Sequence, residues 1–105
     1  MNVPTDAAAL DLLRRQIDEV DAQLLHHLGR RFELCLKIGS LKEQLGIPMM
    51  QPDRIASVTG RAAMNAVRHG VSPVFAEKLW RMIIEEACRL ESDRAPATPR
   101  KEISG

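Results

Sequence analysis

The fold is decided by residues 7–45, AAALDLLRRQIDEVDAQLLHHLGRRFELCLKIGSLKEQL, a run without proline in which glycine occurs only at positions 29 and 39. Apolar side chains recur along it in steps of three and four, at Leu10, Leu13, Ile17, Val20, Leu24, Leu28, Phe32, Cys35, Ile38, Leu41 and Leu45. This spacing is typical of an α-helix. Thr5 or Asp6 can cap its start, and Gly46 can end it. The stretch predicts one helix of about 38 residues, roughly 57 Å long at 1.5 Å per residue.

The length of this helix bears on assembly. A compact chain of 105 residues has a radius of gyration of about 13 Å, so the remaining residues are too few to cover the apolar stripe of the helix. We therefore predict a homodimer, in which a second chain covers the stripe. The alternative is a break at Gly29 that folds the helix back as a hairpin, since glycine inside a helix costs about 1 kcal/mol relative to alanine.

Two shorter helices follow the long one. We expect the second from Pro52 to His69, closed by Gly70, and the third from Pro73 to about Ser92, with Ser72 as its N-cap. The expected buried side chains are Ile55, Val58, Ala62, Ala66 and Val67 on the second helix, and Phe75, Leu79, Met82, Ile83, Ala87 and Leu90 on the third. No strand is predicted, so the expected fold class is all-α, with three helices per chain.

The domain organisation is simple. We expect residues 1–6 to form a flexible lead-in and residues 7–92 to form one helical domain. Residues 93–105 contain two prolines and a single large apolar residue, which is typical of a disordered tail.

Composition and charge exclude several function classes. The formal net charge of +1 argues against nucleic-acid binding, which needs a strongly basic face. No apolar run reaches the length of a membrane span, and residues 1–6 lack the regions of a signal peptide. We expect Cys35 and Cys88 to be reduced, half-buried packing residues, as in a cytoplasmic protein. The three histidines have no metal-ligand spacing with the cysteines, so neither a metal nor a cofactor is predicted.

Cations on the long helix are candidates for binding an anion. Arg31 and Lys42 are eleven residues apart, so they share a face, with Cα atoms roughly 16 Å apart and room for a small anion between the side chains. Arg14 lies about 100° around the axis from Arg31 and reaches such a pocket only from a partner chain. Each cation taken alone also fits a solvated helix face. Spacing by itself predicts an anion-binding helical dimer and no more.

An ordered set of residues resembles the all-helical, or type II, chorismate mutase family over about residues 8–91. The set is Leu13-Arg14-x-x-Ile17-Asp18-x-x-Asp21-x-x-Leu24-Leu25, Leu28-x-Arg30-Arg31, Ile38-Gly39-x-x-Lys42, Pro48, Asp53-Arg54 and Phe75-x4-Trp80-x2-Ile83-Ile84-Glu85. The resemblance implies an intertwined homodimer whose two active sites each take one arginine from the partner chain. It implies a [3,3] rearrangement of chorismate to prephenate, or of 4-amino-4-deoxychorismate to 4-amino-4-deoxyprephenate.

The resemblance also implies roles for single residues. Arg14 of the partner chain, Arg31 and Lys42 match the cations that hold the two carboxylates of a small dianionic substrate. Lys42 also matches a donor to the ether oxygen of the substrate. Arg54 matches an arginine that supports a carboxylate at the start of the second helix. Ile38 and Ile84 match two apolar residues that line the ring pocket.

Four positions depart from the family pattern. Glu91 stands where many members carry a glutamine that donates to the ether oxygen, and a carboxyl group donates only when it is protonated. Gln51 and Ile55 stand where carboxylates usually contact the ring C4 hydroxyl, so the ring-4 substituent is bound differently. Ala87 replaces a serine of some relatives.

Two other functions stay open at this point. The start of the second helix, Pro52-Asp53-Arg54, also resembles that of the isochorismate pyruvate-lyases. A function of another class is an inactive helical dimer that serves as an interaction or regulatory module. The joint presence of Arg14, Arg31, Lys42 and Arg54 argues against such a module, because a scaffold has no need of inward cations.

Overall fold

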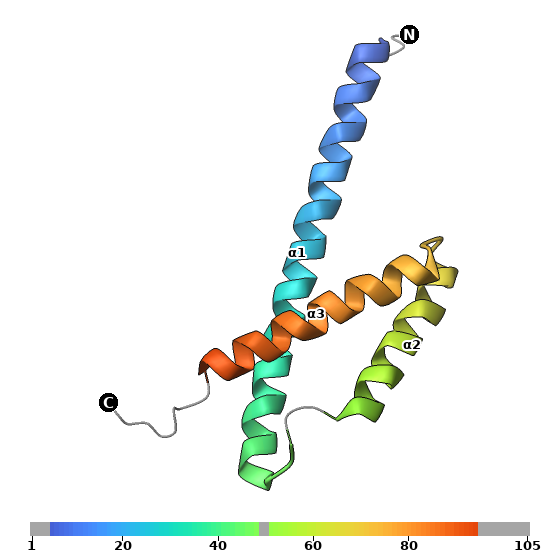
Figure 1. Cartoon of the computed structure of the whole chain (residues 1–105). Helices are drawn as coiled ribbons and strands as arrows, with labels where there is room; N and C mark the ends of the chain where they lie inside the picture. The colour runs from blue at the N-terminus through green and yellow to red at the C-terminus, as the bar shows by residue number, and fades with distance from the viewer. Residues whose placement is uncertain (1–4, 49–50, 95–105) are drawn as a thin grey trace. The chain divides into compact units, whose positions relative to one another are not determined.

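The computed structural model describes residues 5–48 and 51–94, and most of the predicted lead-in and tail lies outside these residues. The described residues form three helices and no strand: α1 (Asp6–Leu45), α2 (Pro52–Arg68) and α3 (Pro73–Arg94) (Figure 1). The predicted all-helical fold class is confirmed.

Helix α1 is a single helix of 40 residues. The Thr5 hydroxyl accepts a hydrogen bond of 3.1 Å from the backbone N–H of Ala8, as expected of an N-cap. At the other end Gly46 adopts a φ of +70°, and the N–H of Ile47 donates to the carbonyl of Lys42 at 2.9 Å. The helix continues through Gly29 without a break, so the hairpin alternative is wrong.

The chain divides into two units, residues 1–33 and 34–105. The described part of the first unit consists of α1 up to Glu33, preceded by Thr5, and no residue of α1 is buried in the single chain. The apolar stripe that predicted the helix is exposed along this unit, with exposed fractions between 48% and 64% for Leu10, Leu13, Ile17, Val20 and Leu24. Residues 5–33 of the first unit therefore form no core of their own.

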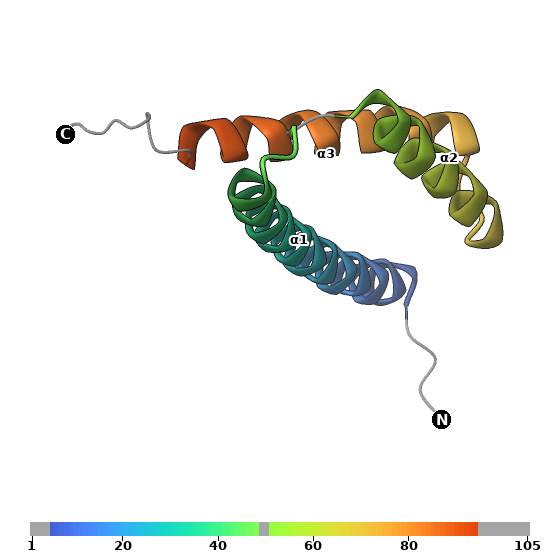
Figure 2. The same cartoon turned by 90° about the horizontal axis from the view of Figure 1, so that it is seen from below.

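The second unit contains the last turns of α1 together with α2 and α3. Helices α2 and α3 are joined by a tight turn and form a helical hairpin, visible in two views (Figures 1 and 2). In the turn Gly70 adopts a φ of +71°, and the N–H of Val71 donates to the carbonyl of Ala66 at 2.8 Å. The Ser72 hydroxyl then accepts from the N–H of Phe75 at 3.2 Å, which confirms Ser72 as the N-cap of α3.

The core of the second unit is built mainly from small residues. Its buried side chains are Ala62, Ala66, Ala76, Ile83 and Ala87, together with Thr59. Alanines in the contact bring helices to the short end of the usual interaxial distance of about 8–10 Å. The buried Thr59 hydroxyl is satisfied locally, because it lies 3.0 Å from the carbonyl oxygen of Ile55.

Part of the predicted core is corrected in the single chain. Val67, Phe75 and Met82 were expected to be buried, but each is more than half exposed. Both shorter helices carry apolar residues on more than one face, and the alanine-rich faces are the buried ones. The predicted set nevertheless includes the buried alanines of α2 and, on α3, the buried Ile83 and Ala87.

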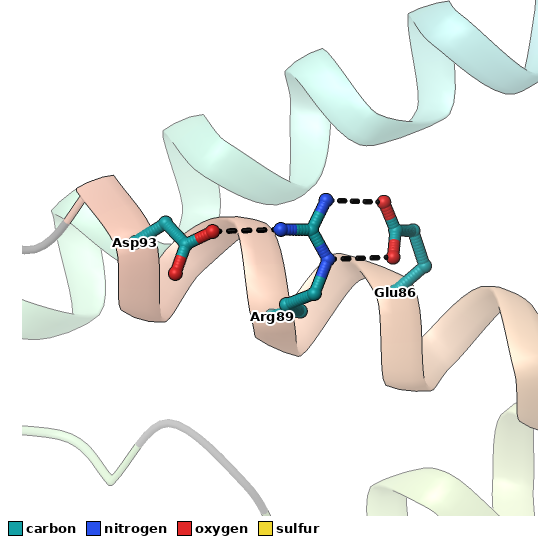
Figure 3. A network of polar contacts seen from close by, with 3 residues as sticks. All are labelled: Glu86, Arg89 and Asp93. Atoms are coloured by element: carbon teal, nitrogen blue, oxygen red, sulfur yellow. Dashed lines mark hydrogen bonds and ion pairs between the residues drawn. The ribbon is translucent and has the colours of Figure 1, made fainter.

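Helix α3 continues two residues beyond the expected end at Ser92. On its exposed side Arg89 donates two hydrogen bonds to Glu86, of 2.9 and 2.7 Å, and one of 2.7 Å to Asp93 (Figure 3). These are neighbours at spacings of three and four, which face each other on a helix. The network connects the last turns of α3, where the helix extends beyond its predicted end.

Two further expectations concern the cysteines and membrane-spanning helices. Cys35 and Cys88 form no disulfide, and both are half-buried, as predicted. Among the helices that the structure describes, none combines the length and the apolar character needed to cross a membrane.

Candidate active site

Within the second unit, the Glu91 side chain of α3 lies against the backbone of α1 at Gly39. A Cβ atom added to Gly39 would lie only 2.7 Å from Oε2 of Glu91 and 3.2 Å from its Cδ. Lys42 follows Gly39 by three residues, almost one helical turn. The structure therefore brings the ends of two helices together at Lys42 and Glu91, both predicted from the sequence as site residues.

The electrostatics of Glu91 reflect this placement. Burial raises the pKa of the Glu91 carboxyl above its ordinary value, and the positive charge of Lys42 opposes the shift. The effect of burial is the larger, so the neutral form of Glu91 persists to higher pH than that of an exposed carboxyl. A protonated carboxyl and an ammonium are both hydrogen-bond donors.

Two thiols belong to the same cluster. The pKa of the Cys88 thiol is raised by burial and also by its interactions with Glu91 and Cys35, while Lys42 acts in the opposite direction. Cys35 of α1 and Cys88 of α3 are thus near the predicted donors. The sequence alone predicts only a packing role for both thiols. The missed signal is their register: Cys35 precedes Lys42 by seven residues and Cys88 precedes Glu91 by three, spacings that share a helix face.

The start of α2 carries the next group of predicted residues. The carbonyl of Gln51 accepts hydrogen bonds from the N–H groups of Arg54 at 2.9 Å and Ile55 at 3.2 Å. Gln51 occupies the N-cap position, but its side chain makes no capping hydrogen bond. The side chains of Gln51 and Arg54 are exposed and that of Ile55 is half-buried. The first turn of α2 therefore holds these residues in a fixed backbone geometry.

The remaining predicted residues lie on α1 and α3. Arg14 is exposed and Arg31 is half-buried, and both belong to the first unit. Ile38 is 51% exposed on α1, and Ile84 is half-buried on α3, both in the second unit. The structure places each of them on the helix that the sequence predicted.

Gly39 is a functional candidate, although in the sequence it stands out only as part of the motif Ile38-Gly39-x-x-Lys42. Its importance depends on the distance between two helices, which the sequence does not state. As for metals, no three His, Cys, Asp or Glu side chains within residues 5–48 and 51–94 are grouped closely enough to hold an ion.

The arrangement in the second unit can act on an anion in one clear way. Lys42 and a protonated Glu91 are two donors in half-buried surroundings. Donors fixed in such surroundings stabilise negative charge that develops on an oxygen atom far better than donors in water. The Cys88 thiol is less ionised than an exposed thiol, because its pKa is raised.

Comparison with known proteins adds the family. The family model described as chorismate mutase type II matches residues 13–92. The chain is 46% identical over 84 residues to a 4-amino-4-deoxychorismate mutase of Streptomyces pristinaespiralis, covering 80% of this chain and 65% of that relative. It is 40% identical over 87 residues to a 4-amino-4-deoxychorismate mutase of Streptomyces venezuelae, covering 83% of this chain and 84% of that one. An isochorismate pyruvate lyase of Pseudomonas aeruginosa is 31% identical over 85 residues, covering 80% of this chain and 82% of the lyase.

Proposed function

The chain belongs to the chorismate mutase type II family, and on that premise we propose that it rearranges 4-amino-4-deoxychorismate to 4-amino-4-deoxyprephenate. The observation that carries the choice of substrate is the pair of relatives at 46% and 40% identity, both of which are named 4-amino-4-deoxychorismate mutases. Chorismate, converted to prephenate, is the second candidate substrate, and the family as a whole supports it.

The proposed reaction makes modest chemical demands. It is unimolecular: the bond between the ether oxygen and the ring breaks while a carbon–carbon bond forms between the enolpyruvyl methylene and the ring. No proton, electron or group enters or leaves. Catalysis therefore consists of holding the flexible dianion in its compact diaxial conformation and stabilising the charge that builds on the ether oxygen. Such effects supply at least about 8 kcal/mol, the lower end of enzymatic rate accelerations.

The charged residues divide this work between them. In the proposal Arg14 of the partner chain, Arg31 and Lys42 hold the two substrate carboxylates, and Arg54 supports a carboxylate from the start of α2. Lys42 and protonated Glu91 donate to the ether oxygen. The closeness of Glu91 to α1 at Gly39, with Lys42 acting on its charge, supports this pair. Ile38 and Ile84 line the apolar side of the ring.

The substituent at ring position 4 meets a neutral surface in this proposal. Gln51 and Ile55 occupy the positions where carboxylates are usual in the family. The Gln51 amide can accept from an amino group as well as donate to a hydroxyl, and the Gln51 side chain is not engaged in capping α2. Ile55 removes a second carboxylate, so the site does not depend on the charge of the substituent.

The proposed enzyme is an intertwined homodimer. In the single chain the apolar stripe of the first unit is exposed, and a helix of this kind is stabilised mainly by packing of its apolar face. An exposed stripe of this size marks a surface that another protein covers. A second copy is the occupant we propose, because it also supplies Arg14 to the site.

The domain and its surroundings complete the proposal. We place the catalytic domain at residues 7–92, which the family match over 13–92 supports. We place the protein in a reducing compartment such as the cytoplasm, which fits two cysteines, Cys35 and Cys88, that are not joined in a disulfide.

A direct assay tests the function. The enzyme is incubated separately with 4-amino-4-deoxychorismate, chorismate and isochorismate, and the products are identified by mass spectrometry. We expect 4-amino-4-deoxyprephenate as the main product, with kcat/KM at least about tenfold above that for chorismate, the size of one lost polar contact. Pyruvate released from isochorismate as the main reaction would instead assign the chain as a lyase. No turnover of any of the three would assign it as an inactive helical module.

The pH dependence of kcat tests the role of Glu91. Only the protonated carboxyl donates, so activity is expected to be present below the pKa of Glu91 and to fall as the pH rises through it. Because that pKa is raised, the fall lies above the ordinary range of glutamate. In Glu91→Gln the amide donates at every pH, and the fall should flatten. An identical profile in the variant removes Glu91 from this role.

A further inference from the structure

Gly39 lies within helix α1, where alanine is favoured over glycine. It does not serve the backbone, because the positive φ angles among the described glycines belong to Gly46 and Gly70. It also differs from the other helical glycines that the structure describes, since an added Cβ meets nothing within 4 Å at Gly29 or Gly60. What distinguishes Gly39 is the Glu91 side chain, whose Oε2, Cδ and Cγ atoms lie 2.7–3.3 Å from the position of that Cβ.

We propose that Gly39 is a positioning residue of the active site: by lacking a side chain, it lets the Glu91 carboxyl lie against α1 close to Lys42. This inference rests on the proposed function, in which Glu91 and Lys42 donate to the same oxygen. Gly39 itself touches no substrate in this proposal. It acts through the place that it leaves free for Glu91.

The geometry predicts what an added methyl group does. At 2.7 Å from Oε2 the methyl overlaps the carboxyl, and something must move. The carboxyl is the free end of a flexible side chain, so Glu91 moves and the helices stay in place. A displacement of about 1 Å at a catalytic group is enough for a loss of about 100-fold in rate. Alanine also favours the helix over glycine, so the variant keeps its fold.

The charge environment of Glu91 changes in a defined direction. The groups that face the cluster are Lys42 and Cys35 from α1, and Cys88 and Glu85 from α3. Burial is the larger influence on the Glu91 carboxyl and raises its pKa. A carboxyl pushed from its place towards water loses much of this burial, so its pKa falls towards the ordinary value. The fall of activity with pH therefore moves to lower pH in Gly39→Ala.

The experiment compares Gly39→Ala with Gly60→Ala, which adds the same methyl group to a helical glycine where nothing lies within 4 Å. For each, kcat, KM and the pH profile are measured with the preferred substrate, together with the melting temperature. We expect Gly39→Ala to lose between about 10-fold and 100-fold in kcat, with an unchanged or higher melting temperature. Gly60→Ala should keep the wild-type kcat and pH profile.

A double-mutant cycle shows whether the effect passes through Glu91. In a Glu91→Ala background the carboxyl is gone, so adding Gly39→Ala should lower kcat no further. An equal loss in both backgrounds overturns the proposal, because Gly39 would then act through another group. A Gly39→Ala variant with wild-type kcat and pH profile overturns it as well.

A measurement without substrate separates this inference from the proposed function. The Glu91 carboxyl is titrated by NMR in the wild type, Gly39→Ala and Gly60→Ala. A lower pKa in Gly39→Ala alone supports the positioning role, and equal values in all three contradict it. If the wild type turns over none of the three substrates, the proposed function fails, while this titration still decides whether Gly39 holds the place of Glu91.

Discussion

The two units of the chain differ in what a single chain buries. In the second unit, α2 and α3 bury alanines and Ile83 between them, so a single chain already provides a small core. In the first unit α1 buries nothing, although its apolar residues repeat as regularly as those of any core helix. The contrast teaches that apolar periodicity predicts a helix with a face to be covered, but does not say which chain covers it.

The largest effect is expected from a charged residue in the apolar stripe of the first unit. Ile17 is 58% exposed in the single chain, so a glutamate there costs little if α1 stands alone. If a second chain covers the stripe, Ile17→Glu buries an unpaired charge at a cost of several kcal/mol. We expect loss of the dimer and of at least about 99% of the activity, measured by sedimentation equilibrium and by the assay.

Glu19→Gln is the matched control, because residue 19 is exposed on the same turns outside the stripe. It should keep both the dimer and the activity. If Ile17→Glu remains a fully active dimer, the covered-stripe explanation of the first unit is wrong.

The second prediction in size tests whether Arg14 of one chain and Lys42 of the other act in the same site. Arg14→Ala removes a cation of the first unit and Lys42→Ala one of the second, and each should lower kcat/KM by about 100- to 1000-fold. Mixing the two variants under exchange conditions lets half of the dimers contain one of each. Such a dimer has one site with both cations, so about a quarter of the wild-type activity should return.

The control is each variant mixed with itself, which should show no recovery. Recovery in the mixed sample requires that Arg14 serve the site of the other chain. If the mixture stays as inactive as its components, either the dimer or the exchange of Arg14 is excluded, and gel filtration of the mixture tells which.

The sequence predicted the fold well where local rules decide it. Thr5 and Ser72 cap their helices, Gly46 and Gly70 end theirs, and α1 passes through Gly29 as expected. These features depend on residues within one turn of each other, which is the range over which sequence patterns act.

The sequence did not predict features that depend on the distance between two helices. Phe75 and Met82 were expected in the core but are exposed in the single chain, whereas Ala76, which was not expected there, is buried. The candidate site shows the same limit. Lys42 and Glu91 were predicted individually, from a family resemblance, whereas the place that Gly39 leaves for Glu91 depends on the approach of α1 to α3. No spacing along one helix contains that distance.

A smaller effect is expected from overfilling the core of the second unit. Ala62→Leu adds three heavy atoms to a buried contact and should lower the free energy of unfolding by about 1–3 kcal/mol. Ala56→Leu, at an exposed position of the same helix, should be nearly neutral. Urea unfolding of both variants measures the difference. Equal stabilities would mean that the alanine contact leaves room for a larger side chain.

The smallest effect belongs to the exposed network of α3, which sharpens the contrast between surface and core within the second unit. Arg89 lowers the pKa of Glu86 by donating to it, so this pair stabilises the folded chain at neutral pH. That contribution is lost as the pH falls below the ordinary range of glutamate, because the carboxylate is then protonated. Arg89→Ala should lower the melting temperature slightly at low salt. The decrease should be smaller at 1 M salt, because the screening length there is only about 3 Å. Arg81→Ala, an exposed arginine of α3 outside the network, is the control. A large loss that persists in high salt would show that the network holds the end of α3, and with it Glu91, in place.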